Sequence, residues 1–343
     1  MPGFRNPFIK SVYKLAKFIP SGWLLHISNQ KLIIPFYHLI SDERIPHVCH
    51  LYPIKNVKSF ASDLDFFLKL YQPLDYLQFQ QLALTNNRPA EPSFLLTFDD
   101  GLKEFDEVIA PVLIQKGIPA ICFLNSGFID NQDLFYRYKA SLLIDHLERN
   151  PDLLSKKIIK DWVSTHSNGI HNIPGWLLSI SYHNKQYLDD FANLVDLNFK
   201  EYLSVYKPYL TSNQIHSLKN KGFHFGAHSI DHPEYRLINF EEQIRQTKNS
   251  VESISTKFSL DYKAFSFPFT DYGVSRQFFD RVYKEHIADI TFASAGQKKE
   301  VFSRHFQRIS FEMTNLTVRE IYNSELLYFI FKAFLGKNTM NRA

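Results

Sequence analysis

The chain has 343 residues, which is enough for one large domain or two smaller ones. Its formal net charge of +4 is too small to indicate a nucleic-acid-binding protein. Its two cysteines, Cys49 and Cys122, cannot form the framework of a disulfide-rich secreted domain. Because Cys122 lies in an apolar run, we expect it to be an inert core residue.

We predict that residues 1–30 form a separate N-terminal amphipathic segment. Within residues 7–27, apolar residues are interrupted by Lys10, Lys14 and Lys17, a pattern typical of helices that lie in a membrane interface. The competing interpretation, which we slightly prefer, is a helix that packs on the rest of the protein. We see no cleavable signal peptide and no apolar run of about 18 residues. We therefore predict a cytoplasmic protein that either stays in solution or binds the inner face of the membrane peripherally through residues 7–27.

Strand-like and helix-like stretches alternate from residue 31 onward. The strand-like stretches are short and apolar, and the helix-like stretches have apolar residues at helical spacing. In chain order they are strand 32–38, helix 57–71, strand 93–98, helix 104–116 ending at Gly117, strand 120–124, strand 223–227, a helix capped by Asn239 and running to about 255, strand 264–267, helix 275–286 and strand 289–293. Repeated βα units predict a parallel sheet closed as a barrel. We assign residues 31–325 to this barrel.

One long interval breaks this alternation. Residues 132–215 read as mostly helical, with helices predicted at 139–148, 151–165, 184–197 and 200–210. A long insertion in a compact domain is usually functional, so we expect these helices to lie beside the site and to shape a substrate groove. The alternative is a decoration that only adds packing. Residues 326–343 are predicted to form an apolar and basic tail, which either packs on the barrel or contacts a membrane.

Two carboxylates and two histidines suggest the chemistry. Asp99 and Asp100 directly follow the strand-like run 93–98, and His228 and His232 are four positions apart. One carboxylate and two imidazoles match the three protein ligands of a catalytic zinc site. Since neighbours on a strand point to opposite sides, we expect Asp100 to bind the metal and Asp99 to take the proton of the attacking water. Either motif alone is common, because Asp-Asp-Gly is also a turn sequence, but together they favour a divalent-metal hydrolase.

These motifs resemble a known family. Residues 97–101, Thr-Phe-Asp-Asp-Gly, and residues 228–233, His-Ser-Ile-Asp-His-Pro, resemble motifs one and two of the polysaccharide deacetylases, the NodB-homology group of carbohydrate esterase family 4. Residues 34–38, which end in Tyr-His, resemble the opening strand of the poly-N-acetylglucosamine deacetylase branch, and residues 264–268 resemble the third motif. The resemblance covers roughly residues 31–130 and 216–312. It implies an α/β fold, a distorted (β/α) barrel of the NodB-homology type, here with the helical insertion.

The resemblance also implies roles for the matching residues. Asp99 is implied to be the catalytic base. The residues implied to hold a divalent metal are Asp100, His228 and His232. The expected metal is Zn²⁺, with Co²⁺, Ni²⁺ or Mn²⁺ as alternatives. The backbone N–H of Phe269, just after Pro268, is implied to help hold the oxyanion.

The chain departs from the family pattern in two places. The third motif lacks the Arg that orients the base in the family, and Arg308 is our candidate to supply that charge. The late Leu-x-His motif, which furnishes the general acid, is not clearly present. Two candidates remain, His38 in the early Tyr-His pair and His305 in the late region. We favour His38, and for His305 we prefer a structural, hydrogen-bonded role.

The sequence therefore predicts a metal-dependent hydrolase that removes an acetyl group from an N-acetylated sugar in a polysaccharide or glycolipid. Two alternatives stay open. One is a deformylase or another C–N amidohydrolase acting on a lipid-linked sugar. The other is a carbohydrate-binding barrel that is catalytically weakened by loss of its acid. The intact Asp99 favours an enzyme, because a metal-binding remnant has no need of a base.

Overall fold

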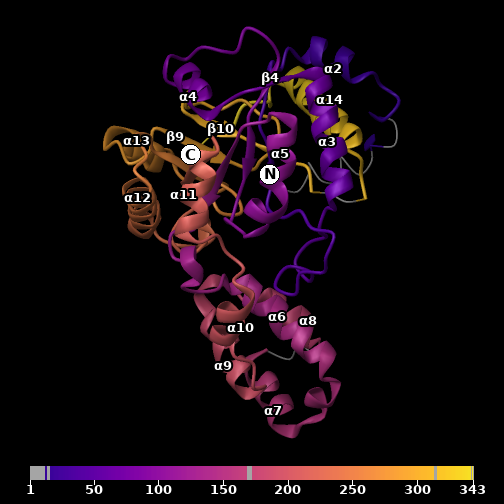
Figure 1. Cartoon of the computed structure of the whole chain (residues 1–343), viewed down its shortest axis with the longest axis vertical. Helices are drawn as coiled ribbons and strands as arrows, with labels where there is room; N and C mark the ends of the chain where they lie inside the picture. The colour runs from indigo at the N-terminus through magenta and orange to yellow at the C-terminus, as the bar shows by residue number, and fades with distance from the viewer. Residues whose placement is uncertain (1–11, 14–15, 168–171, 313–314, 341, 343) are drawn as a thin grey trace.

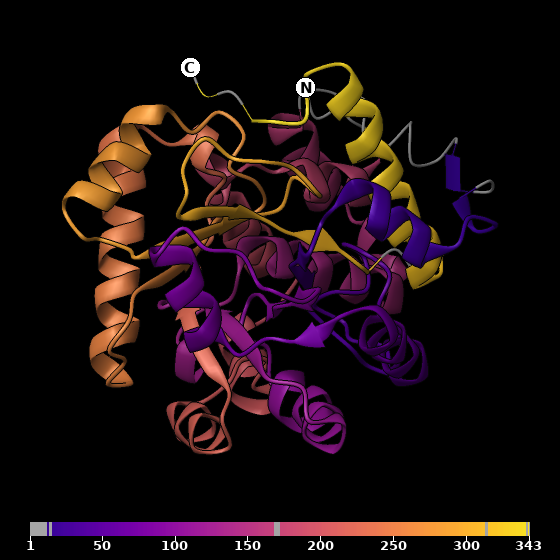
Figure 2. The ribbon, with the colours of Figure 1, turned by 90° about the horizontal axis from the view of Figure 1, so that it is seen from above.

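The computed structural model describes residues 12–13, 16–167, 172–312, 315–340 and 342. Among these residues, eight short parallel strands form one sheet in the order β10-β9-β8-β7-β6-β5-β2-β11. Their bounds are β2 Pro35–Tyr37, β5 Leu96–Phe98, β6 Ala120–Leu124, β7 His224–Ala227, β8 Ala264–Ser266, β9 Ile290–Ala293, β10 His305–Gln307 and β11 Ile309–Ser310. The chain passes from one edge strand to the other through Arg308 alone. The sheet is thus nearly closed into a barrel, and the predicted distorted (β/α) barrel is confirmed (Figure 2).

A second, three-stranded parallel sheet flanks the start of the barrel, in the order β1-β4-β3. Its strands are β1 Leu32–Ile33, β3 Gln72–Pro73 and β4 Ser93–Phe94. The apolar stretches predicted as strands 32–38 and 93–98 are therefore each divided between two sheets. The hydrogen bond from Leu95 N–H to the carbonyl of Ile33 belongs to the small sheet, whereas that from Asp99 N–H to the carbonyl of Tyr37 extends the barrel. Pairing partners, which a local pattern does not contain, decide this division.

Helices surround the barrel, as Figure 2 shows for α12 and α13 on one side and α14 with α2 on the other. The predicted caps are confirmed, because Asn239 accepts a hydrogen bond from Glu242 N–H and Gly117 ends its helix with φ 65°. The helices are α2 Ser21–Ser28, α3 Val57–Leu70, α4 Tyr76–Leu84, the π-helix η1 Phe105–Ile109 continued by α5 Ala110–Lys116, α11 Ser212–Asn220, α12 Phe240–Lys257, α13 Arg276–Lys284 and α14 Val318–Phe334, with single turns η2 Ile129–Asn131 and η5 Tyr235–Leu237.

The two ends of the described chain lie together on the barrel. Residues 7–11 and 14–15 of the predicted amphipathic segment lie outside the described residues, but α2 packs against α14 and Asn323 donates hydrogen bonds of 2.8 Å to the carbonyls of Ala16 and Ile19. Phe18 and Trp23 are exposed, so membrane contact through this segment stays a prediction. Within the described residues, no helix has both the length and the apolar content needed to cross a bilayer.

The predicted insertion forms an arm of helices with a core of its own. Figure 1 shows these helices projecting from one end of the barrel. They are α6 Tyr136–Arg149, η3 Pro151–Ser155, α7 Lys157–His166, α8 Ile173–Ser179, η4 Tyr182–Asn184, α9 Gln186–Leu194 and α10 Phe199–Tyr206. Their buried side chains, such as Leu143, Trp176 and Phe191, form a cluster separate from the barrel core. By contrast, Ile215 and Leu218 of α11 belong to the barrel core.

Candidate active site

The two sequence motifs meet at the carboxyl ends of the barrel strands. Asp100 Oδ1 lies 3.7 Å from His228 Nε2 and 3.4 Å from His232 Nε2. All three side chains are buried, and one ligand atom from each lies within 4.8 Å of the others. Ligands placed about 2.1 Å from a zinc ion at tetrahedral angles are about 3.4 Å apart. The structure thus brings together the three residues predicted to hold a metal, at a spacing that suits one.

Unpartnered polar atoms support a cation at this position. Asp100 Oδ1 and His228 Nε2 are buried and have no hydrogen-bond partner among the described residues, an arrangement that is costly unless a ligand satisfies them. His228 Nδ1 lies 2.8 Å from the carbonyl of Ser266 and donates to it, so that Nε2 keeps a free lone pair. Burial lowers the pKa of His228 to about 4. The imidazole is therefore neutral at pH 7, which is the form that binds metals.

A tight turn explains how neighbouring carboxylates take different directions. The ladder of β5 extends to Asp99, whose N–H donates to the carbonyl of Tyr37 at 3.0 Å. The backbone then enters the left-handed region at Asp100, with φ 70°, and stays there at Gly101, with φ 63°. Glycine is favoured at position 101 because of this positive φ, and a Cβ there would also lie 2.6 Å from Leu124 Cδ2.

Asp99 is held by Arg308, which lies in the seam between the two edge strands. The guanidinium is fully buried and pairs with both carboxylate oxygens, at 2.8 Å and 2.6 Å. It also donates to Thr97 Oγ1 and Ser266 Oγ. Burial alone would raise the pKa of Asp99, but the charge and hydrogen bonds of Arg308, together with the nearby His228 and His38, hold this pKa below its usual value. Arg308 therefore places a fixed positive charge against the carboxylate predicted to be the base.

His38 lies directly after β2 and is paired with Glu312, which the sequence reading missed. Its Nδ1 is 2.6 Å from Glu312 Oε2, and Glu312 Oε1 accepts hydrogen bonds from the N–H groups of His38 and Leu39. Burial would lower the pKa of His38, but the carboxylate of Glu312, with smaller contributions from Asp100 and Asp99, raises it to about 10. The imidazole is therefore protonated at neutral pH, as a proton donor must be.

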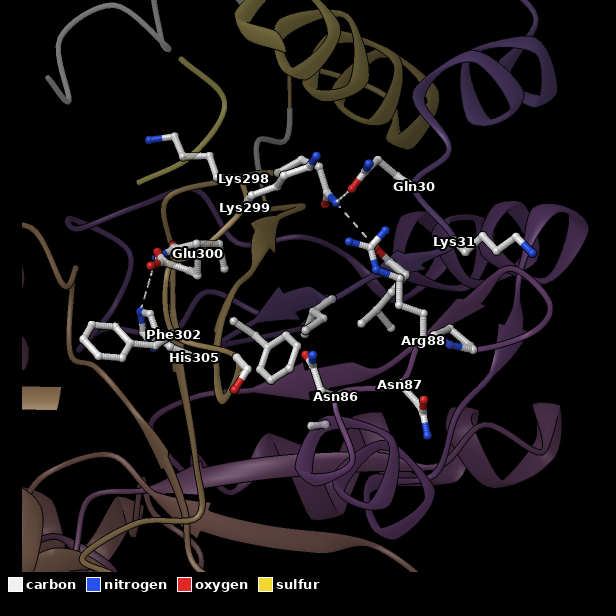
Figure 3. A pocket seen from close by; sticks show the side chains of 18 of the residues that line it. Gln30, Lys31, Asn86, Asn87, Arg88, Lys298, Lys299, Glu300, Phe302 and His305 are labelled. Atoms are coloured by element: carbon white, nitrogen blue, oxygen red, sulfur yellow. Dashed lines mark hydrogen bonds and ion pairs between the residues drawn. The ribbon is translucent and has the colours of Figure 1, made fainter. Parts of the chain in front are cut away.

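His305, the other candidate acid, is placed elsewhere. It is buried, with Nε2 3.0 Å from Asp271 Oδ2 and Nδ1 2.7 Å from Thr291 Oγ1. Figure 3 shows it facing Glu300 in a different pocket of about 270 Å³, which Arg88 also lines. Both ring nitrogens are occupied by buried partners. The geometry therefore suits the structural role that we preferred for this histidine.

A cavity of about 360 Å³ opens onto the carboxylates, a size typical of small-molecule sites. Phe269 lines it and is 36% exposed, whereas Pro268 is not among its described lining residues. Three lining residues come from the start of the insertion, which places the insertion beside the site. The lining residues are Phe36, His38, Leu51, Tyr52, Asp99, Asp100, Phe135, Arg137, Tyr138, His232, Phe267, Phe269, Ser294 and Arg308.

The insertion also contacts the metal ligands directly. The hydroxyl of Tyr138 donates to Asp100 Oδ2 at 2.7 Å, which leaves Oδ1 facing the histidines. Burial raises the pKa of Tyr138 well above its usual value, so its hydroxyl keeps the proton that it donates. The ring of Phe135 packs 4.3 Å from that of His232. Neither aromatic residue belongs to a motif, and no sequence signal distinguishes them from core residues.

Comparisons with known proteins agree with this geometry. The family model described as polysaccharide deacetylase matches residues 86–280. No curated protein sequence matches the chain. Among solved structures, the Streptococcus pyogenes deacetylase PplD in complex with acetate is similar over 86% of this chain and 97% of its own, at 14% identity and a TM-score of 0.54. IcaB from Ammonifex degensii is similar over 85% of this chain and 97% of its own, at 13% identity and a TM-score of 0.52. A de-N-acetylase from Aggregatibacter actinomycetemcomitans is similar over 85% of this chain and 99% of its own, at 13% identity and a TM-score of 0.50. At these identities, the three structures support the fold alone.

Proposed function

This chain belongs to the polysaccharide deacetylase family, and from that premise we propose that it is a metal-dependent enzyme whose active site is the cavity at Asp99 and Asp100. As a family member it is a hydrolase of carbon–nitrogen bonds other than peptide bonds, and its substrate is an acetylated carbohydrate. The reaction that we propose is removal of an acetyl group from an N-acetylated sugar in a polysaccharide or glycolipid. One observation carries the proposal: three buried ligand atoms converge within 4.8 Å of one another, beside a carboxylate that Arg308 keeps ionised.

Asp100, His228 and His232 would hold the metal. A carboxylate with two imidazoles suits Zn²⁺ in a catalytic site, and Co²⁺, Ni²⁺ or Mn²⁺ accept the same donors. When bound, the metal lowers the pKa of a water molecule and polarises the carbonyl of the acetyl group.

The protein's own groups move the protons. Asp99, ionised beside Arg308, takes a proton from the attacking water as the new C–O bond forms at the acetyl carbon. Phe269 lines the cavity, and its N–H is our proposed donor to the developing oxyanion. His38, held protonated by Glu312, gives its proton to the nitrogen as the C–N bond breaks. Acetate and a free amino sugar result, and the atoms balance with one water consumed.

The paired groups bear on the alternatives. A carbohydrate-binding barrel without catalysis needs neither an ionised base nor a protonated acid, yet Asp99 has Arg308 and His38 has Glu312. We therefore favour an enzyme over a binding protein. Formyl and acetyl groups differ by one methyl group, and the acid released in an assay separates a deformylase from a deacetylase.

The test measures metal content together with the release of acetate and of formate from N-acetylated and N-formylated glucosamine oligomers. Asp99→Asn should keep its metal, because Asp99 is not one of the three proposed ligands, and should lose turnover by about 100-fold or more. Asp65→Asn is the matched control, since Asp65 lies on the surface and pairs with Lys116. An Asp99→Asn enzyme as active as this control would refute the assignment of the base.

A further inference from the structure

The charged side chains that line the catalytic cavity are balanced, with one exception. The Arg308 charge is matched by Asp99, and the charge of protonated His38 is matched by Glu312. Asp100 faces the proposed metal. Arg137 is the remaining charged residue among the described lining residues. It comes from the insertion, as the second residue of α6.

The Arg137 side chain is held in place at the edge of this cavity. One guanidinium nitrogen donates to the carbonyl of Leu178 at 2.5 Å, and Nε donates to the hydroxyl of Tyr136 at 3.3 Å. The guanidinium lies 5.8 Å from the centre of the Phe269 ring, which also lines the cavity. The side chain is 27% exposed. Arg137 is therefore fixed in direction, yet a ligand in the cavity can reach it.

Among the described residues, the charge of Arg137 is only partly offset by a carboxylate. Its carboxylate neighbour, Glu234, is 3.7 Å away. The same carboxylate is closer to Arg236, at 2.9 Å and 3.0 Å. Two guanidinium groups thus share one carboxylate, so the three side chains keep a net charge of +1, and Arg137 is the one of the three that lines the cavity. A guanidinium is suited to binding the oxygens of a carboxylate or phosphate, because its N–H groups form a rigid planar fork.

We propose that Arg137 binds an anionic oxygen group, a phosphate or a carboxylate, which the substrate carries next to its N-acetylated sugar. This inference rests on the proposed function and adds a substrate class to it: an acidic or phosphate-bearing amino sugar in place of a neutral polymer. The barrel would then supply the hydrolysis and the insertion would supply the selection. Phe269, which is partly exposed beside Arg137, offers an aromatic face to the sugar ring.

The experiment compares substrates that differ in charge, using the zinc-loaded full-length protein. The substrates are a neutral N-acetylglucosamine oligomer, the same oligomer carrying one phosphate, and an N-acetylglucosamine oligomer containing one uronic acid. The quantity measured is the ratio of kcat/KM for each anionic substrate to that for the neutral one. The wild type should prefer at least one anionic substrate. Whichever is preferred identifies phosphate or carboxylate as the group bound.

Two variants are expected to change the ratio of kcat/KM values in opposite directions. Arg137→Gln should lower the ratio about tenfold or more through KM, because it removes a charge-assisted hydrogen bond. Glu234→Gln should raise the ratio, since it removes the carboxylate that both Arg137 and Arg236 contact in the described part of the chain. Arg137→Lys keeps the charge and should restore part of the preference. Arg281 lies on α13 and pairs with Glu241. Arg281→Gln is therefore the control for loss of a positive charge and should leave the ratio unchanged.

Two results would overturn the inference: a wild type that does not prefer either anion, or an Arg137→Gln variant that loses neutral and anionic substrates equally. If no substrate releases acetate, the proposed function fails. The role of Arg137 in binding an anionic group is then tested by measuring oligomer binding. Calorimetry with the phosphorylated and neutral oligomers should then still show weaker binding of the anionic oligomer by Arg137→Gln. Equal binding of that oligomer by wild type and variant would sink the inference. Thermal melting of Arg137→Gln and Arg137→Lys shows whether either variant is misfolded.

Discussion

The barrel and the insertion contribute to one cavity in different ways. The barrel supplies groups that directly follow strands, such as Asp99 after β5 and His38 after β2, and parallel pairing fixes where they lie. The insertion supplies Phe135, Arg137 and Tyr138 from a single turn at the start of α6. That turn is anchored by a separate hydrophobic cluster. In the function that we propose, strand ends carry the reaction, while the insertion steadies the metal site and selects the substrate.

The largest effect should come from the barrel side. We expect His38→Ala to lower kcat by about 10² to 10⁴, because a general acid contributes that much, and to leave metal content unchanged. An acetyl ester with a good leaving group needs little protonation, so the loss should be much smaller with p-nitrophenyl acetate than with the amide. His216→Ala on the surface of α11 is the control. An equal loss on both substrates would mean that His38 is not the acid.

A smaller effect should come from the insertion side. Tyr138→Phe removes the hydroxyl that holds Asp100 Oδ2 and keeps the ring. We expect zinc affinity to fall by about 10-fold to 100-fold, as is usual when a hydrogen bond to a metal ligand is lost. Competition with a chelator measures this directly. Tyr206→Phe, which removes a hydroxyl elsewhere in the insertion, should keep its affinity. Unchanged affinity in Tyr138→Phe would reduce the insertion to a role in substrate contact.

The smallest effect on the maximal rate should come from a variant that shifts the pH profile. His38 must be protonated to act, so activity falls as pH rises through its pKa, which Glu312 raises to about 10. Glu312→Gln removes that carboxylate, and burial then lowers the pKa. The alkaline limb of kcat/KM should therefore move to lower pH, with activity retained on the acidic side of the new pKa. A limb that stays in place would show that another group donates the proton.

Local sequence patterns were enough to indicate much of the architecture. Apolar runs and helical spacing predicted the strands at 120–124 and 223–227 and the helix that Asn239 caps, because burial and capping act over a few neighbouring residues. The positions of Asp100 and His228 also followed, since both lie just beyond a predicted strand end. The same reading missed α4, although the capping box of Asp75 and Gln78 that begins it is a local signal. It also missed the splitting of run 93–98 between two sheets, because pairing partners are distant in the chain.

Local patterns were therefore sufficient to predict several strands, the carboxylates and histidines at their ends, and the kind of chemistry that those residues favour. The partner of each of these residues could be found only in the folded chain. Arg308 meets Asp99 across 209 positions and Glu312 meets His38 across 274. Tyr138 reaches Asp100 from the insertion. A hydrogen bond requires two groups to approach within about 3 Å. The closure of the barrel brings the first two pairs within this distance, and the packing of α6 against the barrel brings the third. Neither arrangement can be read from one stretch of the sequence.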